Sequence, residues 1–114
     1  FRPHMHMRGR EQSLEAIYPD GRREMLGRVD KYNHFWQITY EYDDHVAPLL
    51  PRGTVLLITT LWDNTADNPV NPDPRQWVLG GPRTIDEMGH VNSQMIFITE
   101  EDYERIRLQR QSKD

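Results

Sequence analysis

Cysteine is absent from the 114-residue chain, which excludes both a disulfide framework and a thiolate metal site. No apolar run approaches the roughly 18 residues that span a membrane. A basic excess is also missing, because 14 Lys and Arg stand against 18 Asp and Glu and give a net charge of −4. The charges are interspersed, which argues against a nucleic-acid-binding face. What remains is one domain's length of chain, with 36% hydrophobic residues for a modest core.

Alternating and β-branched stretches dominate the sequence and predict an all-β fold. The turn signal of Pro19, Asp20 and Gly21 joins two extended runs and predicts a β-hairpin. The clearest two-residue period covers residues 35–42, and residues 54–62 form a nearly continuous apolar run typical of a buried strand. We expect strands at residues 2–8, 13–18, 23–29, 35–42, 54–62 and 94–99. Together they favour an antiparallel β-sandwich, jelly-roll-like in arrangement.

Two further segments complete the expected fold. Residues 63–83 are rich in Pro, Asn and Asp and show no strand or helix period, which predicts a long, specialised loop. Thr99 and Asp102 resemble a capping box, with acidic residues after Thr99 and arginines later, so a short C-terminal helix is expected. The chain opens on Phe1 and Arg2 as though in the middle of a strand, which predicts further protein upstream.

His4 and His6 are the first candidates for chemistry. Residues i and i+2 of a strand point to the same side, so two imidazoles at this spacing can bind one metal ion. Imidazole suits Cu, Zn, Fe and Ni, and the pair alone does not identify the metal. The alternative is two surface histidines on an edge strand.

Met88 is the second candidate, because a thioether is a soft ligand that favours Cu(I). A lone methionine more often fills a core. If this stretch is extended, His90 lies on the same face as Met88. Three roles then remain open for it: a further ligand, a substrate contact or a solvent-facing side chain.

Other donor residues give weaker signals. No role is expected for His34 or His45, which lie beside a strand start and in a loop. Three aspartates of the long loop offer oxygen donors for Ca²⁺ but lack the donor spacing and glycine of an EF-hand: Asp63, Asp67 and Asp73.

The combined motifs resemble those of a known family. They lie at residues 3–9, 18–24, 35–37, 63–74 and 84–88. This pattern is similar to the C-terminal domain of copper type II, ascorbate-dependent monooxygenases of the bacterial branch. These domains are similar to the second domain of peptidylglycine alpha-hydroxylating monooxygenase and dopamine beta-monooxygenase. The resemblance runs from residue 3 to about residue 98, and implies a β-sandwich domain at 1–98, truncated at its N-terminus, with residues 99–114 as a helix or tail.

The resemblance also implies a site. By motif position, His4, His6 and Met88 would bind the copper that activates dioxygen. Arg2 occupies the place of an arginine that holds the substrate carboxylate in the peptide-hydroxylating members. His90 and Asn92 replace the Asn and Tyr that those enzymes use after the ligand methionine, so a peptide substrate does not follow.

The implied activity is hydroxylation of an activated C–H bond of a small-molecule or peptide-like substrate. The family takes its second electron, supplied by ascorbate or another reductant, from another copper held by three histidines in the preceding domain. The implied partner is therefore an upstream copper domain or subunit. The family is usually exported, which implies a periplasmic or extracellular location.

Two alternatives stand beside the enzyme. One is a non-catalytic β-sandwich subunit or docking module of a larger complex that retains the family fold. The other is a copper carrier, which is less favoured because carriers usually expose their ligands on flexible segments.

Overall fold

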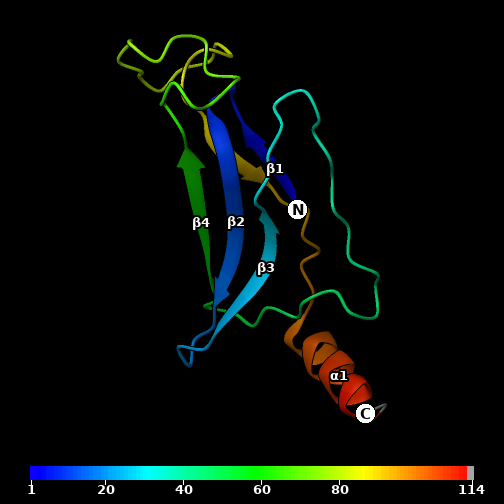
Figure 1. Ribbon diagram of the computed structural model, residues 1–114. Helices are drawn as coiled ribbons and strands as arrows, with labels where there is room; N and C mark the ends of the chain where they lie inside the picture. The colour runs from blue at the N-terminus through cyan, green and yellow to red at the C-terminus, as the bar shows by residue number, and fades with distance from the viewer. Residues whose placement is uncertain (113–114) are drawn as a thin grey trace.

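The computed structural model describes residues 1–112 as two antiparallel sheets and one C-terminal helix (Figure 1). Strands β1 (Arg2–Met5) and β5 (Gly89–Asn92) form a two-stranded ribbon. The second sheet has the order β3-β2-β4, from β2 (Gly9–Ile17), β3 (Arg23–Val29) and β4 (Val55–Trp62). The helix α1 spans Glu100–Gln111. The chain is therefore mostly β, as its alternating pattern predicts.

The predicted hairpin is confirmed as β2 and β3. Its turn closes with the Gly21 N–H donating to the Tyr18 carbonyl, 2.9 Å away, and the Tyr18 N–H donating to Arg22. Gly21 has a φ of 86°, in the left-handed region that a residue without Cβ adopts readily. The local chemistry of this turn fixes the hairpin.

The central strand β2 separates an apolar face from a charged face. Leu14 and Ala16 are buried on one side. On the other, Glu11 pairs with Arg28 and Glu15 with Arg23 across the β2–β3 ladder. The core is small: the buried hydrophobic residues are Met5, Leu14, Ala16, Tyr18 and Tyr32.

Strand β4 is confirmed, but its expected burial is wrong. It lies at the edge of its sheet, paired only with β2 in that sheet. Val55, Leu57 and Leu61 are exposed on the same sheet face as the charged residues of β2, since Leu57 pairs with Glu15 and Leu61 with Glu11. An apolar run predicts a strand, but it does not show whether a second layer covers it.

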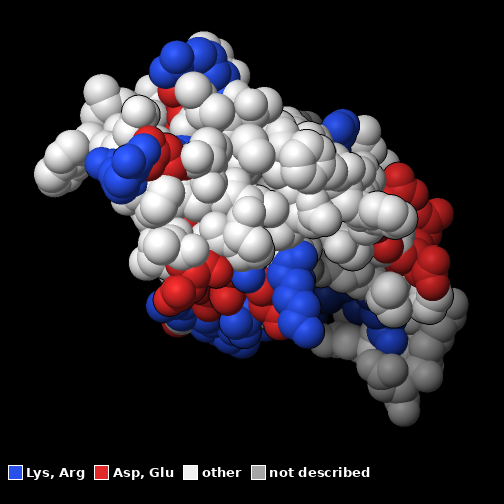
Figure 2. Space-filling view, turned by 45° about the horizontal axis from the view of Figure 1, so that its top comes forward, with Lys and Arg blue, Asp and Glu red and all other residues white. Residues whose placement is uncertain are grey.

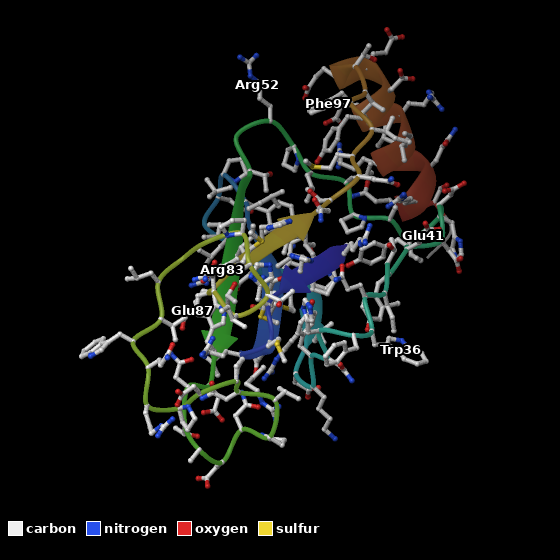
Figure 3. The ribbon with its side chains drawn as sticks, turned by 90° about the horizontal axis from the view of Figure 1, so that it is seen from above. Trp36, Glu41, Arg52, Arg83, Glu87 and Phe97 are labelled. Carbon is white, nitrogen blue, oxygen red and sulfur yellow. The ribbon has the colours of Figure 1, made fainter. Side chains whose placement is uncertain are left out.

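The strand expected at residues 35–42 is not formed. This segment runs beside the N-terminus, where Phe1 and Tyr40 exchange two backbone hydrogen bonds of 2.8 and 2.9 Å. Trp36 and Ile38 are exposed, and Figure 3 shows Trp36 pointing away from the sheets. Alternation is not sufficient for a strand when the pairing stops after one residue.

Two other strand predictions need correction. Residues 94–99 form no strand, and Ile96 and Phe97 are more than nine-tenths exposed, because β5 pairs with β1 earlier, at residues 89–92. The first strand ends at Met5 rather than residue 8, because the Gly9 N–H donates to the His6 carbonyl and closes a turn. A Cβ on Gly9 would lie 2.4 Å from that of Met5, so this turn requires glycine.

The helix and the long loop agree with expectation. Thr99 caps α1, its side-chain oxygen accepting the Asp102 N–H at 3.1 Å. Across residues 1–112, no helix has the length and apolar character needed to cross a membrane. Residues 63–83 form no regular strand or helix and are tied together by buried Asn68, whose amide donates to the Asp63 carbonyl. In Figure 1 this loop lies at the opposite end of the molecule from α1.

The molecule is extended for its size. Its radius of gyration is 17.6 Å, against about 13 Å for a compact domain of this length. Its accessible surface is 8584 Å² at a mass of 13.6 kDa, against about 6,600 Å² for a compact monomer. The two sheets and the helix therefore do not close around one core.

Candidate metal site

One face of the β1–β5 ribbon collects the candidate residues from both ends of the chain. Arg2 lies opposite Asn92, and His4 lies opposite His90. The same register continues beyond the strands to His6 and Met88, where the His6 N–H donates to the Met88 carbonyl at 3.2 Å. Directly opposed residues of antiparallel strands share a face, and alternate residues repeat it. The expected ligands and their neighbours therefore stand in three alternate cross-strand pairs, with Pro3–Val91 and Met5–Gly89 between them.

The segment that carries Met88 is attached to the segment that carries His6 by several hydrogen bonds. Besides the His6–Met88 bond, the Met7 N–H donates to the Thr84 carbonyl at 3.3 Å. His6 Nδ1 lies 3.1 Å from the Asp86 carbonyl oxygen. The segments of residues 6–7 and 84–88 are thus held together by hydrogen bonds that do not involve the Met88 side chain.

Arg8 adds another attachment that the sequence did not indicate. Its side chain is 4% exposed, and its guanidinium donates to the Ile85 carbonyl. The Nε atom is buried without a hydrogen-bond partner, although a buried cation usually requires one.

Nearby, Arg83 and Asp86 form an ion pair of 2.8 Å, and the hydrogen bond from Arg83 is the main cause that lowers the Asp86 pKa. Arg83 lies on the loop leading into β5 (Figure 3).

The rings of His4 and His6 lie at a separation that suits one metal ion. Their centroids are 5.5 Å apart, with an interplanar angle of 81°. A metal–nitrogen bond of about 2.0–2.1 Å places the centre of the imidazole ring about 3.2 Å from the metal. Two such rings at a tetrahedral angle have centres about 5.2 Å apart, close to the observed separation of 5.5 Å. His6 is only 4% exposed, which keeps its ring in place.

Both rings also have hydrogen-bond partners of the kind that metal-binding histidines use. His4 Nδ1 lies 3.2 Å from the Gln37 side-chain oxygen, and His6 Nδ1 lies 3.1 Å from the Asp86 carbonyl oxygen. A carbonyl oxygen only accepts, so each Nδ1 carries the hydrogen. In the neutral ring this leaves the Nε2 lone pair free for a metal, the arrangement common to metal-binding histidines.

Two more imidazoles adjoin this pair. His90 lies 4.7 Å from His4 between ring centroids, and its pKa is lowered, first by burial and then by the charges of His4 and His6. His34, to which the sequence assigned no role, lies 5.9 Å from His6 and bonds through Nδ1 to the Met5 carbonyl. Within residues 1–112, no three His, Asp or Glu side chains are placed to hold a metal ion together. The two-histidine pair would therefore need a donor of another kind, and the register places Met88 beside His6.

The ribbon is fixed to the rest of the protein by buried polar groups and a close backbone approach. Fully buried Gln12 accepts the His4 N–H at 3.1 Å and donates to the Thr60 hydroxyl at 3.0 Å, so it joins β1, β2 and β4. The Tyr32 hydroxyl accepts the Met5 N–H and donates to the Met5 carbonyl. A Cβ on Gly89 would lie 2.6 Å from Thr60 Cγ2, so β5 packs against β4 without room for a side chain.

Known proteins do not add to this description. Comparison of the chain with protein-family models, curated proteins and solved structures finds no match. The functional interpretation therefore rests on the residues of the site and their geometry.

Proposed function

We propose that this chain is the catalytic-copper domain of a dioxygen-dependent monooxygenase that hydroxylates C–H bonds, with His4, His6 and Met88 as the metal ligands. The observation that supports the proposal is the shared face of the β1–β5 ribbon, where His6 lies opposite Met88 and His4 lies in the next pair on the same face. Two imidazoles and one thioether form a soft, incomplete ligand set that suits Cu(I) and leaves a position open for dioxygen.

The chain's own groups would hold and orient the reactants. Nδ1 hydrogen bonds keep Nε2 of His4 and His6 available as ligands. Bound copper would supply the redox chemistry by which dioxygen hydroxylates the substrate. Arg2, on the same ribbon face, offers a cation for an anionic substrate group. His90 and Asn92 line that face as substrate contacts.

Hydroxylation puts one oxygen atom into the C–H bond and releases the other as water, which consumes two electrons beyond those of the C–H bond. Ascorbate is the reductant that fits, delivered through a copper domain upstream or on a partner subunit. We further propose that residues 1–98 form part of a jelly-roll-like β-sandwich in an exported protein. The support for this finer assignment is that the described strands form two antiparallel sheets, which approach each other where Gly89 of β5 meets Thr60 of β4.

Copper titration of the chain tests the ligand assignment. His4→Ala and His6→Ala are expected to weaken binding at least about tenfold, equal to about 1.4 kcal/mol. His45→Ala is the matched control, because His45 is an exposed loop histidine and is expected to leave the affinity unchanged. The same copper affinity in His4→Ala, His6→Ala and His45→Ala would contradict the proposal.

A second candidate is a non-catalytic subunit or docking module of a larger complex. Its support is the accessible surface, which is about 2,000 Å² above that of a compact monomer of this mass. Figure 2 shows a broad uncharged area on one face, with charged side chains gathered toward its borders. Strand β4 also exposes the apolar side chains of Val55, Leu57 and Leu61, and large exposed apolar surfaces mark interaction sites.

Sedimentation of the purified chain separates the two candidates. If β4 is an assembly surface, the chain sediments as an oligomer and Leu61→Glu dissociates it. Leu108→Glu on α1 is the matched control, because Leu61 and Leu108 are both 56% exposed. A monomer that binds copper through His4 and His6 favours the monooxygenase domain.

A further inference from the structure

We propose that Gln37 is a positioning residue of the metal site, which fixes the ring of His4 and links it to Arg2. The inference rests on the proposed function, because it assigns Gln37 a role toward a ligand of that site. Gln37 lies in the irregular segment of residues 35–42, remote in sequence from both halves of the site. Its side-chain oxygen lies 3.2 Å from His4 Nδ1 and 3.4 Å from the Arg2 guanidinium.

The identity of the facing amide atom follows from Arg2. A guanidinium has only donors, so the Gln37 atom that it meets must be the oxygen. The same oxygen then accepts from His4, and the hydrogen of the neutral ring must sit on Nδ1. Arg2 thereby sets the orientation of the Gln37 amide, and Gln37 sets the tautomer of His4.

His4 needs such a partner because its ring is not buried as the His6 ring is. The His4 backbone is fixed, since its N–H donates to buried Gln12 and its register partner is His90. Its half-exposed ring can still turn about the Cβ–Cγ bond, which exchanges the two ring edges. The hydrogen bond to Gln37 selects the orientation that presents Nε2 on the ribbon face. For His6, the Asp86 backbone carbonyl does the same.

One amide oxygen therefore serves both a metal ligand and the cation proposed to meet the substrate. Arg2 and His4 are neighbours two residues apart on the same strand face. Holding both from a third segment sets their relative positions, and loss of Gln37 releases the two together. Replacing such a hydrogen-bond partner of a metal-binding histidine typically costs about 10–100-fold in metal affinity.

The test measures the His4 tautomer and the copper affinity separately. Nitrogen-15 NMR of the metal-free chain at about pH 8, where imidazoles are neutral, reports which ring nitrogen of His4 carries hydrogen. Copper titration gives the dissociation constant of the same variants. The variants are Gln37→Ala, Gln37→Glu, which keeps an acceptor oxygen, and Gln109→Ala as a control on the exposed surface of α1.

We expect His4 to carry hydrogen on Nδ1 in the wild-type chain, in Gln37→Glu and in Gln109→Ala. Gln37→Ala should shift His4 toward the Nε2–H form and weaken copper binding about tenfold or more. An unchanged His4 tautomer in Gln37→Ala, or a changed tautomer with unchanged copper affinity, would overturn the positioning role. Failure of the wild-type chain to bind copper would overturn the proposed function and the positioning role with it. This outcome is distinguishable from failure of the Gln37 role alone, because the titration of the wild-type chain shows it without any variant.

Discussion

The His6 N–H donates to the Met88 carbonyl over 3.2 Å, and this bond joins two residues 82 positions apart in the sequence. It continues the register of the β1–β5 ribbon by one cross-strand pair beyond Met5 and Gly89. Because the bond is between backbone groups, the two segments meet independently of any metal. The site is therefore organised by strand pairing, and a ligand would find its donors already brought together.

Gly89→Ala is expected to destabilise the protein by about 1–3 kcal/mol through overpacking. The new Cβ would lie 2.6 Å from Thr60 Cγ2 and 2.9 Å from the Trp62 ring, so β5 must move away from β4. Copper affinity should fall as well, because Met88 precedes Gly89 directly. Denaturant unfolding measures the first effect and copper titration the second.

Gly80→Ala provides the control for this substitution. A Cβ on Gly80 would meet only the Glu87 carbonyl, at an ordinary 3.8 Å, so both measurements should stay at wild-type values. Equal stability of the two alanine variants would show that β5 does not pack against β4 as described.

Tyr32→Phe should lower the free energy of unfolding by about 1–3 kcal/mol, because the Met5 N–H loses its hydrogen-bond partner in a buried position. The Met5 carbonyl also loses the hydroxyl donor, although His34 still bonds to it. Urea unfolding measures the change. Tyr40→Phe is the control, since its side chain is exposed, and a loss of the same size there would rule out a specific role for the Tyr32 hydroxyl.

The same residue predicts a dependence of stability on alkaline pH. Burial raises the pKa of Tyr32 above its ordinary value, so the folded state holds the proton more firmly than the unfolded state. The stabilising contribution is fully present below the unfolded pKa of about 10 and is lost as the pH rises through the folded pKa. The stability difference between the wild-type chain and Tyr32→Phe should therefore shrink above about pH 10. A difference that stays constant or grows there would contradict this account.

Features set by neighbouring residues could be predicted from the sequence. The Gly21 turn and the Thr99 cap depend on local backbone chemistry, and both occur as expected. The strand predictions at residues 35–42 and 94–99 were wrong because a strand also needs a partner at the right place, which a period of two does not encode. The exposure of β4 has the same origin, since burial depends on a covering layer.

The candidate site likewise combines residues that the sequence identifies as donors with residues that it does not single out. The His4–His6 spacing and the soft thioether of Met88 were readable as donor types, and strand pairing brings their segments together. The sequence assigned no role to Arg8, Gln37 or His34, because each acts through a contact with a residue more than 25 positions away. A buried arginine and a surface glutamine have no distinguishing mark in the sequence.

X-ray absorption of the Cu(I)-loaded chain tests the ligand set most directly. We expect a nitrogen shell from two imidazoles together with one sulfur scatterer. In Met88→Leu the sulfur scatterer should disappear while the nitrogen shell remains. Met25→Leu, which alters an exposed methionine of β3, should leave the spectrum unchanged. Absence of a sulfur shell in the wild-type chain, or an unchanged Cu(I) affinity in Met88→Ala, would contradict the central claim.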